Sequence, residues 1–92
     1  MPEWSHEFIG TDRPYLDGER EMLLHLVEKL PYYDSSGNCF LFRDAEGHCI
    51  VWFSKRRVAL EVGADIRARF TVKSHREYNG VRENIVKSFR IL

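Results

Sequence analysis

The chain has 92 residues, a formal net charge of zero, and apolar and charged fractions of 43% and 30%. A chain of this size folds as one domain with a modest core, so residues 1–92 are predicted to form a single domain. No apolar run approaches the roughly 20 residues of a membrane-spanning helix, and the first residues lack signal-peptide character. These features predict a cytoplasmic protein that does not enter a membrane.

The charges are unevenly divided between the two halves of the chain. Residues 1–50 carry ten acidic against four basic side chains, a balance of −6, and residues 51–92 carry ten basic against four acidic ones, a balance of +6. This division permits a basic surface on the C-terminal half. It equally permits the acidic half to lie on that surface and mask it.

Residues 1–30 are predicted to form an arm followed by one helix. Gly10 and Pro14 break regular structure in the arm. Asp17 is a suitable N-cap for a helix over residues 17–30, and Pro31 would end it. Apolar residues recur at i, i+1, i+4, i+5 and i+8, which gives one stripe on a helix. They are Met22, Leu23, Leu26, Val27 and Leu30.

The rest of the chain is rich in aromatic and β-branched residues, which favour strands. Five strands are predicted, over residues 38–43, 48–54, 58–62, 66–74 and 81–91. The first two form a hairpin around residues 44–47, in which residues whose numbers sum to 91 lie opposite each other. Five strands and one helix predict a mainly β fold, arranged as a small closed or nearly closed β-barrel.

The sequence shows no pattern typical of an active site or a metal site. Cys39 and Cys49 lie out of register in the central hairpin, too far apart for a disulfide, so free, buried thiols are predicted. The four histidines lack zinc-site spacing, and neither a nucleophile motif nor a phosphate-binding loop occurs. We therefore expect a protein that is not an enzyme and that carries no metal or cofactor.

Basic side chains on the predicted strand 66–74 suggest a surface for a polyanion. Arg67, Arg69 and Lys73 alternate with apolar residues, and Arg82 and Lys87 would extend the row across the last hairpin. Charges about 7 Å apart along a strand match the phosphate repeat of an extended single strand. Cations on an outer strand face are as often only solvated, and both interpretations stay open.

Two further groups would complete such a surface. One is a triplet of cations at a strand exit, for which a solvated bend is the alternative: Lys55, Arg56 and Arg57. The other is the last turn, where the rings of His75 and Tyr78 would stack on bases. Alternatively, the Tyr78 ring folds back over its hairpin, and Asn79-Gly80 supplies the positive φ of the turn.

The central hairpin also contains several aromatic residues that could form a stacking surface. Phe40, Phe42, Trp52 and Phe53 are more consistent with the filling of a small core. If one of them is exposed and stacks on a base, Trp52 or Phe40 is the predicted one.

Three linked motifs occur between residues 38 and 83: FRDAEGHCIVWF, LEVG and TVKSHREYNGV. They resemble an OB-fold-like domain of bacterial phage and mobile-element proteins, in which F-x-D-x-x-G-x-x-x-V-W-F precedes L-x-V-G and T-V-K-x-H-x-E-Y-x-G-V. The matching positions are Phe42, Asp44, Gly47, Val51, Trp52, Phe53, Leu60, Val62, Gly63, Thr71, Val72, Lys73, His75, Glu77, Tyr78, Gly80 and Val81. The resemblance implies a small OB-like barrel linked to DNA replication and recombination. Against that pattern, a helix over residues 17–30 would replace the first hairpin of the barrel and reshape its binding face.

These observations predict a non-enzymatic OB-like module that binds single-stranded DNA or RNA with low sequence specificity, in the DNA processing of a phage or mobile element. The basic residues would contact phosphates, while His75, Tyr78 and Trp52 would stack on bases. The alternative is a protein-interaction module, a phage-encoded accessory or inhibitor protein that binds a host or phage protein through its acidic helix or a barrel edge. Either would be a monomer or a homodimer.

Overall fold

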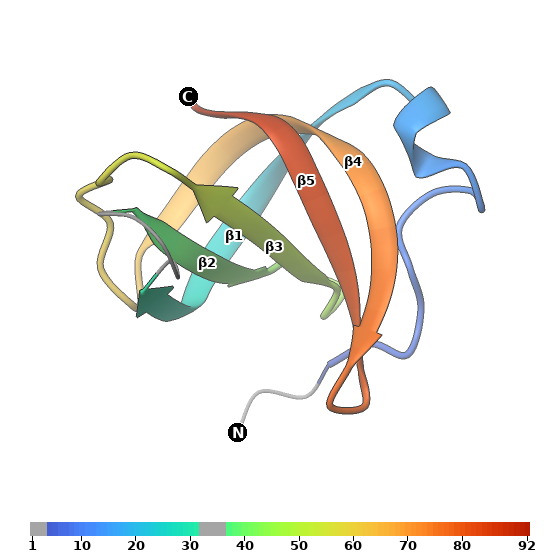
Figure 1. Cartoon of the computed structure of the whole chain (residues 1–92), viewed down its shortest axis with the longest axis horizontal. Helices are drawn as coiled ribbons and strands as arrows, with labels where there is room; N and C mark the ends of the chain where they lie inside the picture. Colours follow the sequence, from blue (N-terminus) through green and yellow to red (C-terminus); the bar gives the residue numbers. More distant parts are fainter. Residues whose placement is uncertain (1–3, 32–36) are drawn as a thin grey trace.

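Five strands make up the fold in a computed structural model, which describes residues 4–31 and 37–92 (Figure 1). They are β1 (Glu19–Pro31), β2 (Asn38–Arg43), β3 (Cys49–Ser54), β4 (Asp65–Tyr78) and β5 (Val81–Ile91), preceded by a short 3-10 turn, η1 (Pro14–Leu16). The strands close into a barrel in the order β1-β2-β3-β5-β4. Neighbours are antiparallel except β3 and β5, which run parallel. The predicted small OB-like barrel of five strands is therefore confirmed.

The predicted helix over residues 17–30 is wrong, because this segment forms the first strand of the barrel. The N-terminal half of β1 pairs with β4, and its C-terminal half pairs with β2. Met22, Leu24 and Leu26 point inward, while Leu23 is exposed. The exposed Leu23 and Leu30 completed an apolar pattern with helical spacing, so the alternation typical of a strand was not recognised. Pairing with strands on both sides outweighs the modest helix propensity of this segment. The first strand of the OB-like barrel is thus present, and no helix replaces it.

The predicted strand over residues 58–62 is also wrong. Residues 55–64 form the connection from β3 to β4 and are held against β1 by two backbone hydrogen bonds. Leu26 donates to the carbonyl of Ala64, and Gly63 donates to the carbonyl of Leu26. Val58 and Leu60 pack on the core from this connection. The predicted number of five strands is still correct, because β1, which was predicted as a helix, is the fifth strand.

The central hairpin is paired one residue away from the predicted register. Residues whose numbers sum to 92 lie opposite each other, so that Phe40 faces Trp52 and Arg43 faces Cys49. Because side chains alternate between the two faces, a shift of one residue changes which side chains of β2 lie on the same face as Trp52: Phe40 does, and Cys39 does not. Both cysteines are free, as predicted.

The N-terminal arm packs against the core of the barrel. Figure 1 shows the arm running from the region of the β4–β5 turn up to η1. Ile9 is buried in the core, and its backbone N–H donates to Oδ1 of the fully buried Asn84 at 2.8 Å. The Asn84 amide in turn donates to the carbonyl of Cys49 at 2.9 Å. One side chain therefore links the arm, β3 and β5.

The core of the barrel is largely aromatic. Phe40, Phe42 and Phe70 are fully buried, and Phe89 stacks on the half-buried Trp52 with ring centroids 4.1 Å apart. Such offset ring contacts add to the stabilisation from burial. None of the described residues belongs to a helix long and apolar enough to cross a membrane.

Candidate nucleic-acid interface

The cations predicted on one face of β4 are paired with acids of β1. Because the two strands are neighbours, Arg69 donates to Glu21 at 2.8 Å, and Arg67 lies 3.5 Å from the same carboxylate. Arg90 of β5 donates to Glu19 at 2.9 Å. The hydrogen bond from Arg69 holds the pKa of Glu21 below its ordinary value. The acidic residues of β1 therefore mask the basic face of β4. This is the second of the two arrangements that the uneven distribution of charge between the two halves of the chain permits.

The other predicted phosphate contacts are dispersed. Lys73 and Lys87 are exposed on β4 and β5, and Arg82 lies 5.3 Å from the centre of the Phe8 ring. The triplet that follows β3 is exposed and begins with a local turn, in which Ser54 Oγ accepts from Arg56 N–H and donates to the Arg56 carbonyl. The structure therefore does not bring the predicted cations together on one face.

His75 is engaged by the N-terminal arm. Its ring stacks on Phe8 with centroids 4.4 Å apart, and its Nε2 lies 2.8 Å from the carbonyl oxygen of Ile9. The imidazole thus anchors the arm on β4, and Phe8 already occupies one face of its ring. Tyr78, by contrast, keeps 57% of its surface exposed at the end of β4.

The aromatic side chain that faces outward from the central hairpin is Phe53, not Trp52 or Phe40. Phe40 is fully buried, and Trp52 is half-buried against Phe40 and Phe89. Phe53 is 38% exposed, since successive residues of β3 point to opposite faces. The alternation in Cys49–Ser54 could have identified it, had Ile50 been recognised as the inward position.

A groove of about 550 Å³ crosses the outer surface of β1, β2, β3 and β5 beside the β4–β5 turn. Its lining includes Trp4 of the arm, Leu41 of β2, Val51 of β3 and Tyr78 of β4. OB barrels bind oligonucleotides on this face, formed by strands 2 and 3 together with the loop that joins strands 4 and 5. The groove is therefore the strongest candidate for a binding site.

An ion pair lies in this groove, between Arg76 and Glu83. The two residues are opposite each other in the β4–β5 hairpin, and Nε and Nη2 of Arg76 both donate to Oε1 of Glu83, at 2.9 and 2.5 Å. The guanidinium carbon lies 5.8 Å from the centre of the Phe53 ring and 5.2 Å from that of Tyr78. A guanidinium between two rings forms a continuous surface suited to stacking. Glu83 escaped the sequence prediction, although its place opposite Arg76 follows from the turn at Asn79-Gly80.

The two thiols are held in their neutral form by burial. Burial raises the pKa of Cys39 to about 11 and that of Cys49 to about 12. Since the thiolate is the reactive species, we expect a disulfide reagent at pH 8 to label the folded protein roughly 100-fold more slowly than the protein in urea. Equal rates in the two conditions would contradict the burial of these groups.

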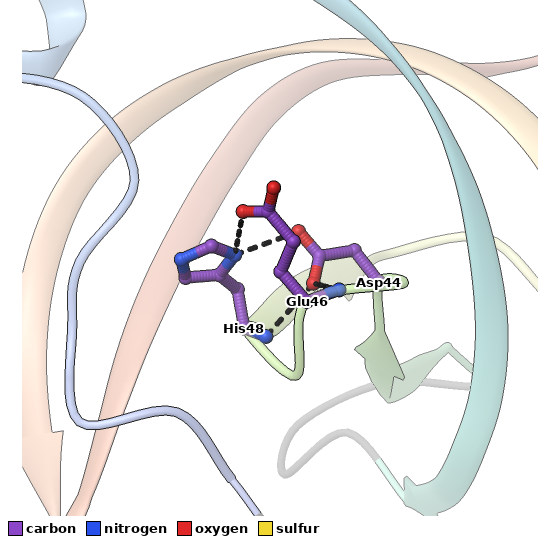
Figure 2. A group of neighbouring side chains, drawn as sticks. All are labelled: Asp44, Glu46 and His48. Atoms are coloured by element: carbon purple, nitrogen blue, oxygen red, sulfur yellow. Dashed lines mark hydrogen bonds and ion pairs between the residues drawn. The ribbon is translucent and has the colours of Figure 1, made fainter.

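Asp44, Glu46 and His48 gather at the tip of the central hairpin (Figure 2). Their ligand atoms lie within 4.8 Å of one another, and two carboxylates with an imidazole suit a divalent metal ion. The oxygens of Asp44 are already occupied, however: Oδ1 accepts from the backbone N–H groups of Glu46 and His48, and Oδ2 lies 2.8 Å from Nδ1 of His48. We assign the cluster to closure of the turn.

Comparison of the chain with protein-family models, with curated proteins and with solved structures found no match. The fold and the groove define an OB-like barrel in which the end of β4 places an aromatic ring and a guanidinium at the edge of a groove across β2 and β3. The likeness of residues 38–83 to phage and mobile-element proteins stays a prediction.

Proposed function

We propose that this chain is a non-enzymatic module that binds single-stranded DNA or RNA in the groove across β2, β3 and β5. The observation that carries the proposal is the exposed Tyr78 ring beside the Arg76 guanidinium, on the face that OB barrels use for oligonucleotides. Stacking on a ring suits every base, which agrees with low sequence specificity. The sequence resemblance favours a role in the DNA processing of a phage or mobile element.

The cations nearest the groove would contact the phosphates. The triplet 55–57 follows β3, beyond the pair formed by Phe53 and the groove residue Cys39. Arg82 is not included, since it points away from Glu83 on β5 and lies against Phe8. Arg67 and Arg69 are not included, since Glu21 already pairs with them. Binding should weaken with salt, with a log–log slope of about −0.7 per neutralised phosphate.

A titration of a labelled single-stranded 12-mer at two salt concentrations tests the proposal. We expect Tyr78→Ala to weaken binding about tenfold, because loss of one stacked base costs about 1–3 kcal/mol. Tyr15→Ala is the matched control, since Tyr15 is 52% exposed on η1 and does not line the groove. Absence of binding at low salt, or equal losses in both variants, would contradict the proposal.

Glu21→Gln distinguishes the groove from the paired face of β4. The substitution releases Arg67 and Arg69 from their carboxylate partner. If nucleic acid binds in the groove, the dissociation constant should change less than about twofold, because exposed ion pairs contribute little. A several-fold gain in affinity would instead place the phosphates on β4.

Protein binding is a second candidate function, favoured by the apolar floor of the same groove. Val51 is fully buried on the outer side of β3, and Val27, Leu30 and Leu41 line the groove beside it. Such a floor suits an apolar side chain of a host or phage protein. Retention of a specific protein from nuclease-treated lysate by the wild type but not by Tyr78→Ala would favour this function. Light scattering would separate both cases from homodimer formation.

A further inference from the structure

The carboxylate of Glu83 is buried at the floor of the proposed binding groove and incompletely satisfied. The residue is only 4% exposed, yet it lines the groove. Oε1 accepts both hydrogen bonds from Arg76. Oε2 has no hydrogen-bond partner within residues 4–31 and 37–92, and it is not among the fully enclosed atoms. A ligand N–H group that reaches this accessible oxygen would form a charge-assisted hydrogen bond to it, which would stabilise the complex.

A carboxylate at this position determines which part of a nucleotide can lie on the floor. It repels phosphates, which must lie away from it, toward the triplet 55–57. It favours a base that offers N–H groups, since an ionised carboxylate only accepts hydrogen bonds. The remaining N–H groups of Arg76 can donate to an acceptor on the same base, because a guanidinium has five such groups and two of them are used.

We propose that Glu83 is a specificity-determining residue that makes one base position of the groove discriminate against uracil and thymine. The inference rests on the proposed function. Cytosine presents an exocyclic amino donor where uracil and thymine present a carbonyl acceptor. The N3–H of uracil lies between two carbonyl oxygens, and both of them repel a carboxylate. The discrimination is superimposed on the sequence-tolerant stacking by Tyr78.

Competition between oligo-dC and oligo-dU tests the inference, since these bases differ only at position 4, amino against carbonyl, and in the proton on N3. We expect the wild-type protein to bind oligo-dC about tenfold more tightly, as one well-placed base contact supplies. In Glu83→Gln, whose amide can both donate and accept, the ratio should fall to within about twofold. Glu28→Gln, which alters another acid of the groove lining, should retain the preference.

A ligand modification gives the same information without a protein variant. Oligo-dC with N4,N4-dimethylated bases lacks the amino donors, so the wild type should bind it as weakly as oligo-dU. Equal affinity for oligo-dC, its dimethylated form and oligo-dU would overturn the inference and leave the proposed function standing. Failure of every strand to bind at low salt would overturn the proposed function itself.

Discussion

Replacing Asn84 with alanine is expected to lower the free energy of unfolding by about 3 kcal/mol. The substitution leaves the buried N–H of Ile9 and the carbonyl of Cys49 without their partner, at about 1–3 kcal/mol for each unsatisfied group. A domain of this size has a total stability of roughly 5–14 kcal/mol. Urea titration followed by far-ultraviolet circular dichroism would measure the loss.

Lys87→Ala is the matched control for Asn84→Ala, because Lys87 is exposed on the same strand. Its effect should stay within about 0.5 kcal/mol, as for other surface substitutions. If Asn84→Ala were equally mild, the arm would not be anchored through this amide. Faster proteolysis of the arm in Asn84→Ala than in Lys87→Ala would further support the anchor.

Phe89→Ala should lower the free energy of unfolding by about 3–4 kcal/mol. The parallel ladder between β3 and β5 pairs residues 49–51 with residues 83–85, and Phe89 lies beyond its end. Its ring centroid lies 4.1 Å from that of Trp52, 5.4 Å from Phe42 and 5.8 Å from Phe70. Loss of a packed aromatic ring removes these contacts and leaves a cavity between the strands.

Phe89→Leu is the comparison for this substitution, since leucine retains much of the apolar volume. We expect it to cost about 1.5 kcal/mol, roughly half the loss in Phe89→Ala. Tryptophan emission should shift to longer wavelength in Phe89→Ala, as water reaches Trp52. Equal stability of the two variants would show that the ring does not close this side of the barrel.

The existence of the two hairpins was predictable because their signals are local, although the register of the central one was wrong by one residue. Asn79 and Gly80 both have positive φ, as the tight β4–β5 turn requires, and apolar residues alternate in the flanking strands. β1 was not predictable in this way, because Leu23 and Leu30 are apolar but exposed. The resulting pattern fits a helix, and only pairing with β4 and β2 decides for a strand.

The binding surface was harder to predict than the fold because ion pairing depends on which strands become neighbours. Arg67 and Arg69 stand on an outer face, as alternation predicts, but β1 places Glu21 beside them. The stacking partner of His75 could not be predicted for the same reason, since Phe8 lies far away in the sequence. For Tyr78 two arrangements stayed open, and the structure exposes the ring because it borders its own turn, where few other segments can cover it.

The link between Ile9 and Asn84 has a consequence for synthesis of the chain on the ribosome. These residues are 75 positions apart, and β5 supplies partners to both β3 and β4. Until β5 has left the exit tunnel, the nascent chain can form at most an open sheet of β1 to β4, whose apolar inner face lacks its last strand. Closure must therefore follow translation of residues 81–91, and until then the nascent sheet is a natural substrate for chaperones that shield apolar surface.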